Sequence, residues 1–118
     1  MATKNKECTR AFSDAHEKSV CKALGARQQA NSCAGLFNKG DCVQDDASLL
    51  IECKTCMEPK ESFSIKKDWI VKNKDEAFAL RLDSNCIAFN FGPNQANYYI
   101  IDEKLMRFLV DKLIEDQQ

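Results

Sequence analysis

The sequence predicts a single α/β domain, spanning residues 1–118, in which helices flank a mixed central β-sheet. Three observations predict it. Apolar residues recur at helical spacing near both ends of the chain, short apolar runs bounded by turn residues lie between them, and 118 residues is the length of one compact domain with its own core. In chain order the segments give α-β-β-β-α-β-β-α, a sheet with helices packed on it.

The first predicted helix runs from Glu7 to Leu24. Its core-facing stripe consists of apolar and small residues, namely Phe12, Ala15, Ser19, Val20, Ala23 and Leu24. Gly25 can end the helix, because glycine readily adopts a positive φ. Glu17 lies at the edge of the stripe. His16, the only histidine, lies on its apolar side and is expected to be a packed core residue.

Two strands are predicted in the middle of the chain. Asp41–Val43 is the first, Ala47–Cys53 is the strongest strand segment of the sequence, and Asp45-Asp46 between them supplies turn residues. Residues 28–37 are small and polar, and they are expected to form a short strand or a loop.

The second half is expected to contain a helix, a pair of strands and a final helix. The predicted segments are a helix from Ser64, as N-cap, to Leu80, strands Cys86–Phe91 and Tyr98–Ile101 around a Gly92-Pro93-Asn94 turn, and a helix Glu103–Glu115. The spacing of Leu105, Leu109, Val110, Leu113 and Ile114 predicts that the last helix buries one face.

Composition gives limited information about partners. The formal net charge is −1, so any DNA binding must come from local basic patches. The seven cysteines form an odd, scattered set, which favours a reducing cytosol over a disulfide framework. The first ten residues are polar and charged, and no apolar run approaches the roughly 20 residues that cross a bilayer. We expect a cytoplasmic protein without membrane partners.

The predicted strands bring charged side chains together. Strand alternation directs Glu52 and Lys54 to one face. In an antiparallel hairpin centred between residues 46 and 47, Asp41 lies opposite Glu52, with Cβ atoms about 4.5–5.5 Å apart. Two carboxylates this close attract a divalent cation, and oxygen ligands suit Mg²⁺ or Mn²⁺. Lys54 beside the ion can orient water or stabilise the negative charge of a phosphate under attack.

At this point the chain resembles a known nuclease superfamily. Asp41, ten intervening residues and Glu52-x-Lys54 match the PD-(D/E)XK signature. The segments that sharpen the resemblance to archaeal-type and phage Holliday-junction resolvases are Ser32-Cys33-Ala34, Lys39-Gly40-Asp41, Leu50-Ile51-Glu52-Cys53-Lys54-Thr55, Ser62-Phe63-Ser64-Ile65, Trp69 and Glu76-Ala77. The resemblance extends from about His16 onward. Cys33 departs from it, since the family more often has glycine there.

The resemblance implies a restriction-endonuclease-like core and a metal-dependent DNA endonuclease that resolves four-way junctions in recombination and repair. It implies a homodimer, because resolution needs two symmetric cuts, and a host-cell cytoplasm if the chain is of phage origin. It also implies that Glu17 is a third metal ligand and that Ser32 is a catalytic residue. Trp69 is a candidate contact between the two copies.

Several alternatives remain beside this interpretation. Asp46, five residues before Glu52, is a rival for the first acid, although Asp45-Asp46 is needed for the turn. Cys53-x-x-Cys56 could indicate zinc or redox chemistry, but no second such pair follows at zinc-site spacing. Alternative functions are a less selective nuclease acting on flaps, nicks or duplex DNA, and a non-catalytic DNA-binding accessory protein.

The basic residues of the chain have two interpretations. Lys39, Lys60, Lys66 and Lys67 are predicted to contact DNA phosphates, and Lys72 and Lys74 extend the cluster around the second helix. A solvated helix face is the alternative. Phe63 and Trp69 are interpreted as packing residues in preference to base-stacking groups.

Overall fold

A mixed five-stranded sheet with helices on both faces forms the protein. The computed structural model describes residues 6–29 and 41–118, and the side chains of residues 12–29 and 42–118. The elements are α1 (Lys6–Leu24), β1 (Arg27–Gln28), β2 (Asp41–Gln44), β3 (Leu49–Lys54), α2 (Lys67–Ala79), β4 (Ser84–Phe89), β5 (Tyr98–Ile100) and α3 (Glu103–Asp116). The predicted α/β class and the order α-β-β-β-α-β-β-α are confirmed.

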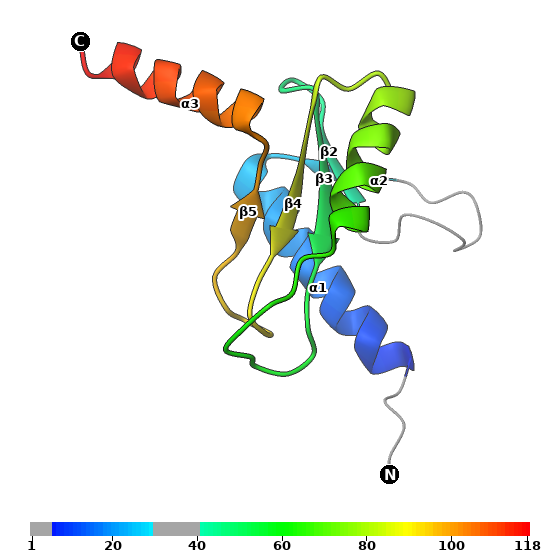
Figure 1. The fold of residues 1–118 in the computed structure, drawn as a ribbon. Helices are drawn as coiled ribbons and strands as arrows, with labels where there is room; N and C mark the ends of the chain where they lie inside the picture. The colour runs from blue at the N-terminus through cyan, green and yellow to red at the C-terminus, as the bar shows by residue number, and fades with distance from the viewer. Residues whose placement is uncertain (1–5, 30–40) are drawn as a thin grey trace.

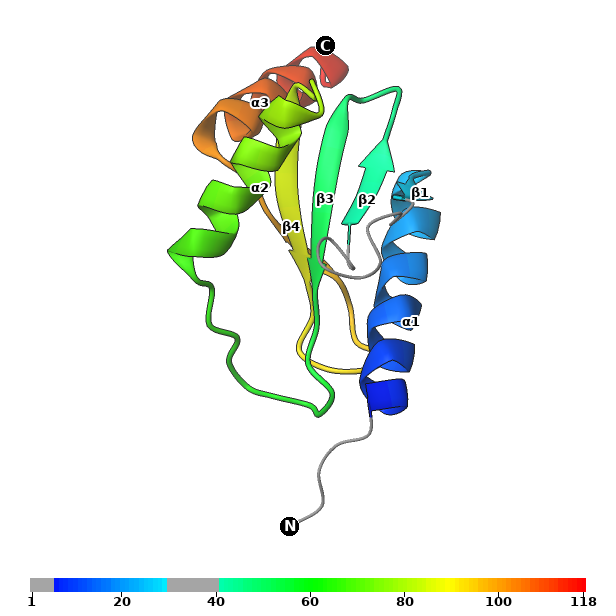
Figure 2. The same cartoon turned by 90° about the vertical axis from the view of Figure 1, so that its right-hand side faces the viewer.

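The sheet has the spatial order β1-β2-β3-β4-β5. Strands β1, β2 and β3 pair antiparallel, β3 and β4 pair parallel, and β4 and β5 pair antiparallel. The parallel pair requires a crossover, which α2 provides. Helix α1 covers one face and α2 covers the other, so the two helices lie on opposite sides of the sheet (Figure 1, Figure 2).

Strand alternation divides the core into two layers. On the α1 side, the buried residues Val20, Cys42, Ile51, Cys86 and Ala88 form one cluster. On the α2 side, Val43 and Leu50 pack with Ala77 and the partly buried Leu82. Each fully buried aliphatic side chain contributes about 1.5–3 kcal/mol relative to an exposed one. The neighbouring strands β2 and β3 thus contribute to both layers, which fixes their register.

The register of the β2–β3 hairpin is the predicted one. Asp41 pairs with Glu52 and Val43 pairs with Leu50. The amide of Ser48 donates to the carbonyl of Asp45 at 3.1 Å and closes the turn. Asp45 is also held by a bidentate interaction with Arg27, at 2.7 and 3.0 Å.

The end of α1 follows the sequence prediction. Gly25 has a φ of +63°, the left-handed conformation that glycine adopts without steric cost. The amide of Ala26 donates to the carbonyl of Cys21 at 2.9 Å. The chain can therefore turn directly into β1. The sequence predicts a short strand or a loop over residues 28–37. Of these, only Gln28 belongs to β1, and residues 30–37 lie outside the described residues.

The predicted start of α2 is wrong. The helix begins at Lys67, and its N-cap Lys66 has an extended backbone and no side-chain cap hydrogen bond. The reason is tertiary packing before the helix. The ring of Phe63 lies 5.2 Å from that of Phe89 in β4 and 6.3 Å from that of Trp69. These contacts hold the chain against the sheet past Ser64, the residue expected to cap the helix.

The predicted burial of α3 is also wrong. Asp102 caps the helix by accepting from the amide of Leu105 at 2.9 Å, and α3 then extends away from the β5 edge of the sheet (Figure 1). All residues of α3 are described, and none of them is buried. Within the described part of the chain, no element therefore buries the apolar face of this amphipathic helix.

Candidate active site

The last residues of β3 form a close acid–base pair. The ammonium nitrogen of Lys54 lies 3.3 Å from the carboxylate of Glu52, with the two side chains 32% and 16% exposed. Both residues follow Leu50 on the α2 side of the sheet, as strand alternation predicts. Water can reach this pair, and the partial burial of Glu52 strengthens its attraction for a cation.

An indole ring borders the pair. The ammonium nitrogen of Lys54 lies 4.5 Å from the ring centroid of Trp69, in the first turn of α2, and that of Lys66 lies 5.8 Å from the same ring. Such distances allow a cation–π attraction. The ring of Phe63 supports Trp69 from the sheet side. The sequence pattern assigned Trp69 to packing and gave no sign of its contact with Lys54, because fourteen residues of the crossover lie between them.

Asp41 is the first residue of β2, and its backbone lies directly opposite Glu52. Its side chain lies outside the description, as do Ser32 and Lys39 entirely. The rival acid Asp46 lies in the turn at the other end of the hairpin, beyond the pair of Gln44 with Leu49. Of the two alternatives, the register therefore favours Asp41 as the residue beside Glu52.

Glu17 lies on the other side of the sheet from Glu52. Its carboxylate accepts a hydrogen bond from the amide nitrogen of Gln28 at 3.1 Å. Only 7% of Glu17 is exposed, and burial raises the pKa of its carboxyl group. Gln28 pairs with Cys42, whose side chain belongs to the core layer under α1. The structure thus does not bring Glu17 next to Glu52, and its role as a metal ligand stays a prediction.

Within the described residues, no three side chains of His, Cys, Asp and Glu form a group able to hold a metal ion. The donor chemistry at the end of β3 nevertheless fits a hard cation. Glu52 offers carboxylate oxygens beside the backbone of Asp41, and such oxygens are the ligands that Mg²⁺ prefers.

The predicted basic rim is partly assembled around this site. Lys60, Lys66 and Lys67 are exposed, and Lys66 shares the ring of Trp69 with Lys54. Lys72 instead pairs with Asp68 one turn away, at 3.1 Å with both side chains largely exposed. Of this rim, Lys66 is therefore the lysine that its contact with Trp69 brings beside the Glu52–Lys54 pair.

Four cysteines meet in the α1 layer. The thiol of Cys21 donates to the sulfur of Cys42 at 2.9 Å, and the sulfurs of Cys42 and Cys53 lie 3.9 Å apart. Burial raises the pKa of Cys21 and of Cys86 to about 12. Cys53 thus faces the core, as predicted. The thiol of Cys56 contacts the carbonyl of Asn90 instead, so these contacts give no support to a site at Cys53-x-x-Cys56.

His16 is a buried residue, as expected from the apolar side of α1. It is 5% exposed, and burial lowers the pKa of its imidazole, with an opposing contribution from the side chain of Asn97. It lines a hollow between α1 and the loop that follows β4, together with Ser19, Thr55 and Asn90. The hydroxyl of Thr55 donates to the side-chain oxygen of Asn90 at 2.7 Å and ties the end of β3 to that loop.

No family model, curated protein or solved structure matches this chain. Within the described residues, no helix has both the length and the apolar character needed to cross a membrane.

Proposed function

We propose that this protein is a Mg²⁺- or Mn²⁺-dependent endodeoxyribonuclease of the PD-(D/E)XK kind, with Asp41, Glu52 and Lys54 in its active site. One observation carries the proposal. The hairpin register sets Asp41 opposite Glu52, and Lys54 lies 3.3 Å from Glu52 at the same end of the sheet. This is the arrangement of two acids and a lysine that the signature requires.

Each residue has a distinct role in the proposed reaction. Asp41 and Glu52 would hold the ion through carboxylate oxygens. A Mg²⁺ ion held there would supply neutralisation of charge on the scissile phosphate and a lowered pKa for a water molecule. Lys54 orients the attacking water and stabilises negative charge as it accumulates on the phosphate oxygens. Its present partners, Glu52 and Trp69, keep the ammonium group at the site before DNA binds.

DNA binding is attributed to phosphate contacts from basic residues near the site. Lys66 and Lys67 lie at the start of α2 and Lys60 in the segment before it, all exposed. Lys39 belongs to the same proposed set. Such contacts supply affinity without sequence information, which suits an enzyme that recognises DNA shape.

A four-way junction is the proposed substrate, and a homodimer is the proposed active form. A junction has near-two-fold symmetry, and a closed dimer presents two identical sites related by the same operation. Each copy contributes one site, so two copies are needed for paired cuts. A less selective nuclease with the same active site is the alternative outcome.

A cleavage assay on three substrates tests the proposal. The protein is incubated with a four-way junction, a flap and a linear duplex of the same sequence, in Mg²⁺, Mn²⁺, Ca²⁺ or excess chelator. We expect junction cleavage in Mg²⁺ and Mn²⁺ only, because Ca²⁺ takes more ligands in looser geometry and positions water poorly. Cleavage of all three substrates alike would favour the general nuclease.

The matched control is Glu61→Gln, which removes an exposed carboxylate outside the site. It should cleave as the unaltered protein does, whereas Glu52→Gln should not. Full activity in excess chelator would exclude the proposed mechanism. Binding to all three DNAs without cleavage in any metal would favour the accessory-protein alternative.

A further inference from the structure

Helix α3 is amphipathic but covers nothing in its own chain. Its six most exposed large apolar residues have between 40% and 61% of their surface accessible, namely Met106, Phe108, Leu109, Val110, Leu113 and Ile114. None of its fourteen residues is buried. Helices of soluble proteins place such a stripe against another element, because exposed apolar surface is unfavourable in water.

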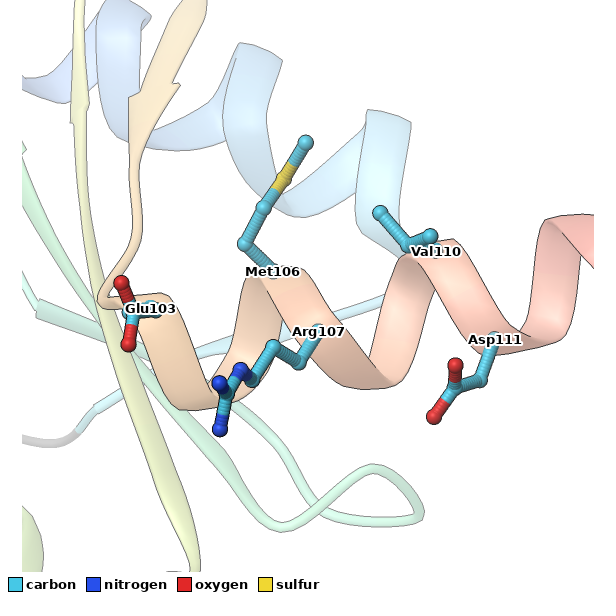
Figure 3. Close-up of a pocket in the computed structure, with 5 residues that line it drawn as sticks. All are labelled: Glu103, Met106, Arg107, Val110 and Asp111. Carbon is cyan, nitrogen blue, oxygen red and sulfur yellow. The ribbon is translucent and has the colours of Figure 1, made fainter.

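One side of α3 combines this apolar surface with opposite charges. Residues 103, 106, 107, 110 and 111 follow helical spacing and line a shallow hollow. Figure 3 shows the side chains of Met106 and Val110 above Glu103, Arg107 and Asp111 along this side. An apolar strip with a positive and a negative residue one turn apart can match a reversed copy of itself.

We infer that α3 pairs antiparallel with α3 of a second copy of this chain. Phe108 lies on the opposite side of the helix from Met106 and Val110, so the strip consists of the other five side chains. Together they amount to on the order of 400 Å² of apolar surface, within the range of the largest and often functional patch on a monomer. A standard interface buries roughly 800 Å² per partner, so a helix pair with its polar flanks approaches that area. The inference rests on the homodimer of the proposed function and names the surface that forms it, and the pairing can be measured without any cleavage of DNA.

The charges of α3 favour the antiparallel arrangement. Glu103, Lys104 and Arg107 give the first half of the helix one net positive charge. The second half has two net negative charges, from Asp111, Lys112, Glu115 and Asp116, and Lys112 is already engaged by Glu115 at 3.6 Å. A reversed partner brings opposite halves together, and the two helix dipoles also oppose each other. A parallel partner would place like charges side by side.

The same geometry specifies a contact between copies. When the two-fold axis passes near Leu109, Arg107 of each copy faces Asp111 of the other. Both residues flank Met106 and Val110 on the same side of the helix (Figure 3). The pair is partly shielded by this apolar strip, which strengthens the attraction relative to a fully hydrated pair.

Sedimentation equilibrium of the full chain tests the pairing. The unaltered protein should be a dimer at micromolar concentration. Leu109→Glu combined with Leu113→Glu should raise the dissociation constant more than roughly 30-fold, because two charges per copy would enter the apolar contact. Circular dichroism should be unchanged, since these leucines are 45% and 61% exposed. A monomeric unaltered protein, or a double variant that remains dimeric, would overturn the inference.

Phe78→Glu is the matched control, because Phe78 is 86% exposed on α2 and equally apolar. This variant should remain a dimer. If it becomes monomeric while the α3 variant stays dimeric, the contact lies on α2 and the inference is wrong.

A charge exchange tests the orientation separately. Arg107→Glu and Asp111→Arg should each weaken the dimer, since each variant alone brings like charges together. Mixed in equal amounts, the two single variants should form a heterodimer with two restored pairs. Contacts within one helix are not restored by mixing, so recovery on mixing requires pairing between copies. Failure of the mixture to associate more tightly than either variant would contradict the antiparallel arrangement.

Discussion

The ammonium group of Lys54 lies 4.5 Å from the ring centroid of Trp69 while it remains 3.3 Å from the carboxylate of Glu52. An anion and an aromatic face thus contact the same cation. The long side chain of lysine has much rotational freedom, and two contacts reduce it before substrate arrives. Trp69 is in this way a positioning residue for Lys54 in the proposed reaction.

Replacing the indole ring should slow cleavage without preventing DNA binding. A cation–π contact at a partly exposed site is worth about 0.5–1 kcal/mol, or roughly a two- to fivefold change in rate. We expect Trp69→Leu to lower kcat by about that factor with little change in KM, and Trp69→Phe to retain more of the activity. Single-turnover cleavage of the proposed junction substrate measures both variants.

The contact has a second readout that does not depend on catalysis. Trp69 is the only tryptophan in the chain, so its fluorescence reports directly on its neighbours. Lys54→Met should change the emission of Trp69 more than Lys66→Met, because the Lys66 ammonium is 5.8 Å from the ring centroid. Equal emission in both variants would contradict the contact even if the nuclease proposal were correct.

Substitutions at the two acids and the lysine should separate binding from cleavage. Asp41→Asn, Glu52→Gln and Lys54→Ala should each reduce cleavage to background, because each removes a group needed to hold the ion or stabilise charge. DNA affinity should persist, since other lysines supply the phosphate contacts. Cleavage and gel-shift assays on the same preparations measure the two effects. A Glu52→Gln protein that cuts at the normal rate would refute the active-site assignment.

The sequence predicted the hairpin because local rules agree there. Turn residues at Asp45-Asp46 between two strand segments centre the hairpin there, and that centre places Asp41 opposite Glu52. The pairing of Glu52 with Lys54 follows from alternation alone. The contact of Lys54 with Trp69 could not be predicted, since it depends on how α2 packs across the sheet.

Helix ends and burial were less accessible to sequence analysis. Ser64 is a good N-cap residue, but the packing of Phe63 on Phe89 delays the helix to Lys67. In α3, periodicity correctly indicated an amphipathic helix of nearly the observed length. Periodicity shows that a helix has an apolar face, and it does not show which surface covers that face.

The buried imidazole of His16 should make stability depend on pH. Burial lowers its pKa below the ordinary value of 6.5, so the unfolded chain takes up a proton more readily than the native protein. The neutral imidazole's contribution to the free energy of unfolding is complete above the ordinary pKa of 6.5. This contribution is lost as the pH falls through the lowered pKa of the native protein. Glu17, whose pKa is raised by burial, has the opposite effect at lower pH.

Thermal melts of the unaltered protein and His16→Leu at several pH values measure this effect. The unaltered protein should lose free energy of unfolding between about pH 7.5 and pH 5.5, the range around the ordinary histidine pKa. His16→Leu should lose less over the same interval, whatever its stability at neutral pH. Parallel pH profiles for the two proteins would show that the imidazole of His16 has the same pKa in the native and unfolded states.

The side chain of Gln44 joins α1 to the β2–β3 turn. Its amide nitrogen donates to the carbonyls of Leu24 and Gly25, at 3.1 and 3.0 Å. Its oxygen accepts from the amides of Asp46 and Ala47, at 2.8 and 3.2 Å. Two helix-terminal carbonyls and two turn amides thus find partners in one residue. The two turn amides belong to the hairpin that determines the register of Asp41 with Glu52.

Gln44→Met should lower the free energy of unfolding by about 1–3 kcal/mol. Methionine has a similar length, but it offers no hydrogen-bond partner to the four backbone groups that the Gln44 amide contacts. The cost stays at this modest scale because water can reach part of this region. Urea unfolding followed by circular dichroism measures the change, with Gln117→Met at the exposed end of α3 as the control. Equal stability of the two variants would mean that water replaces the Gln44 amide without loss. In that case the turn residues and the core layers alone would determine the hairpin register.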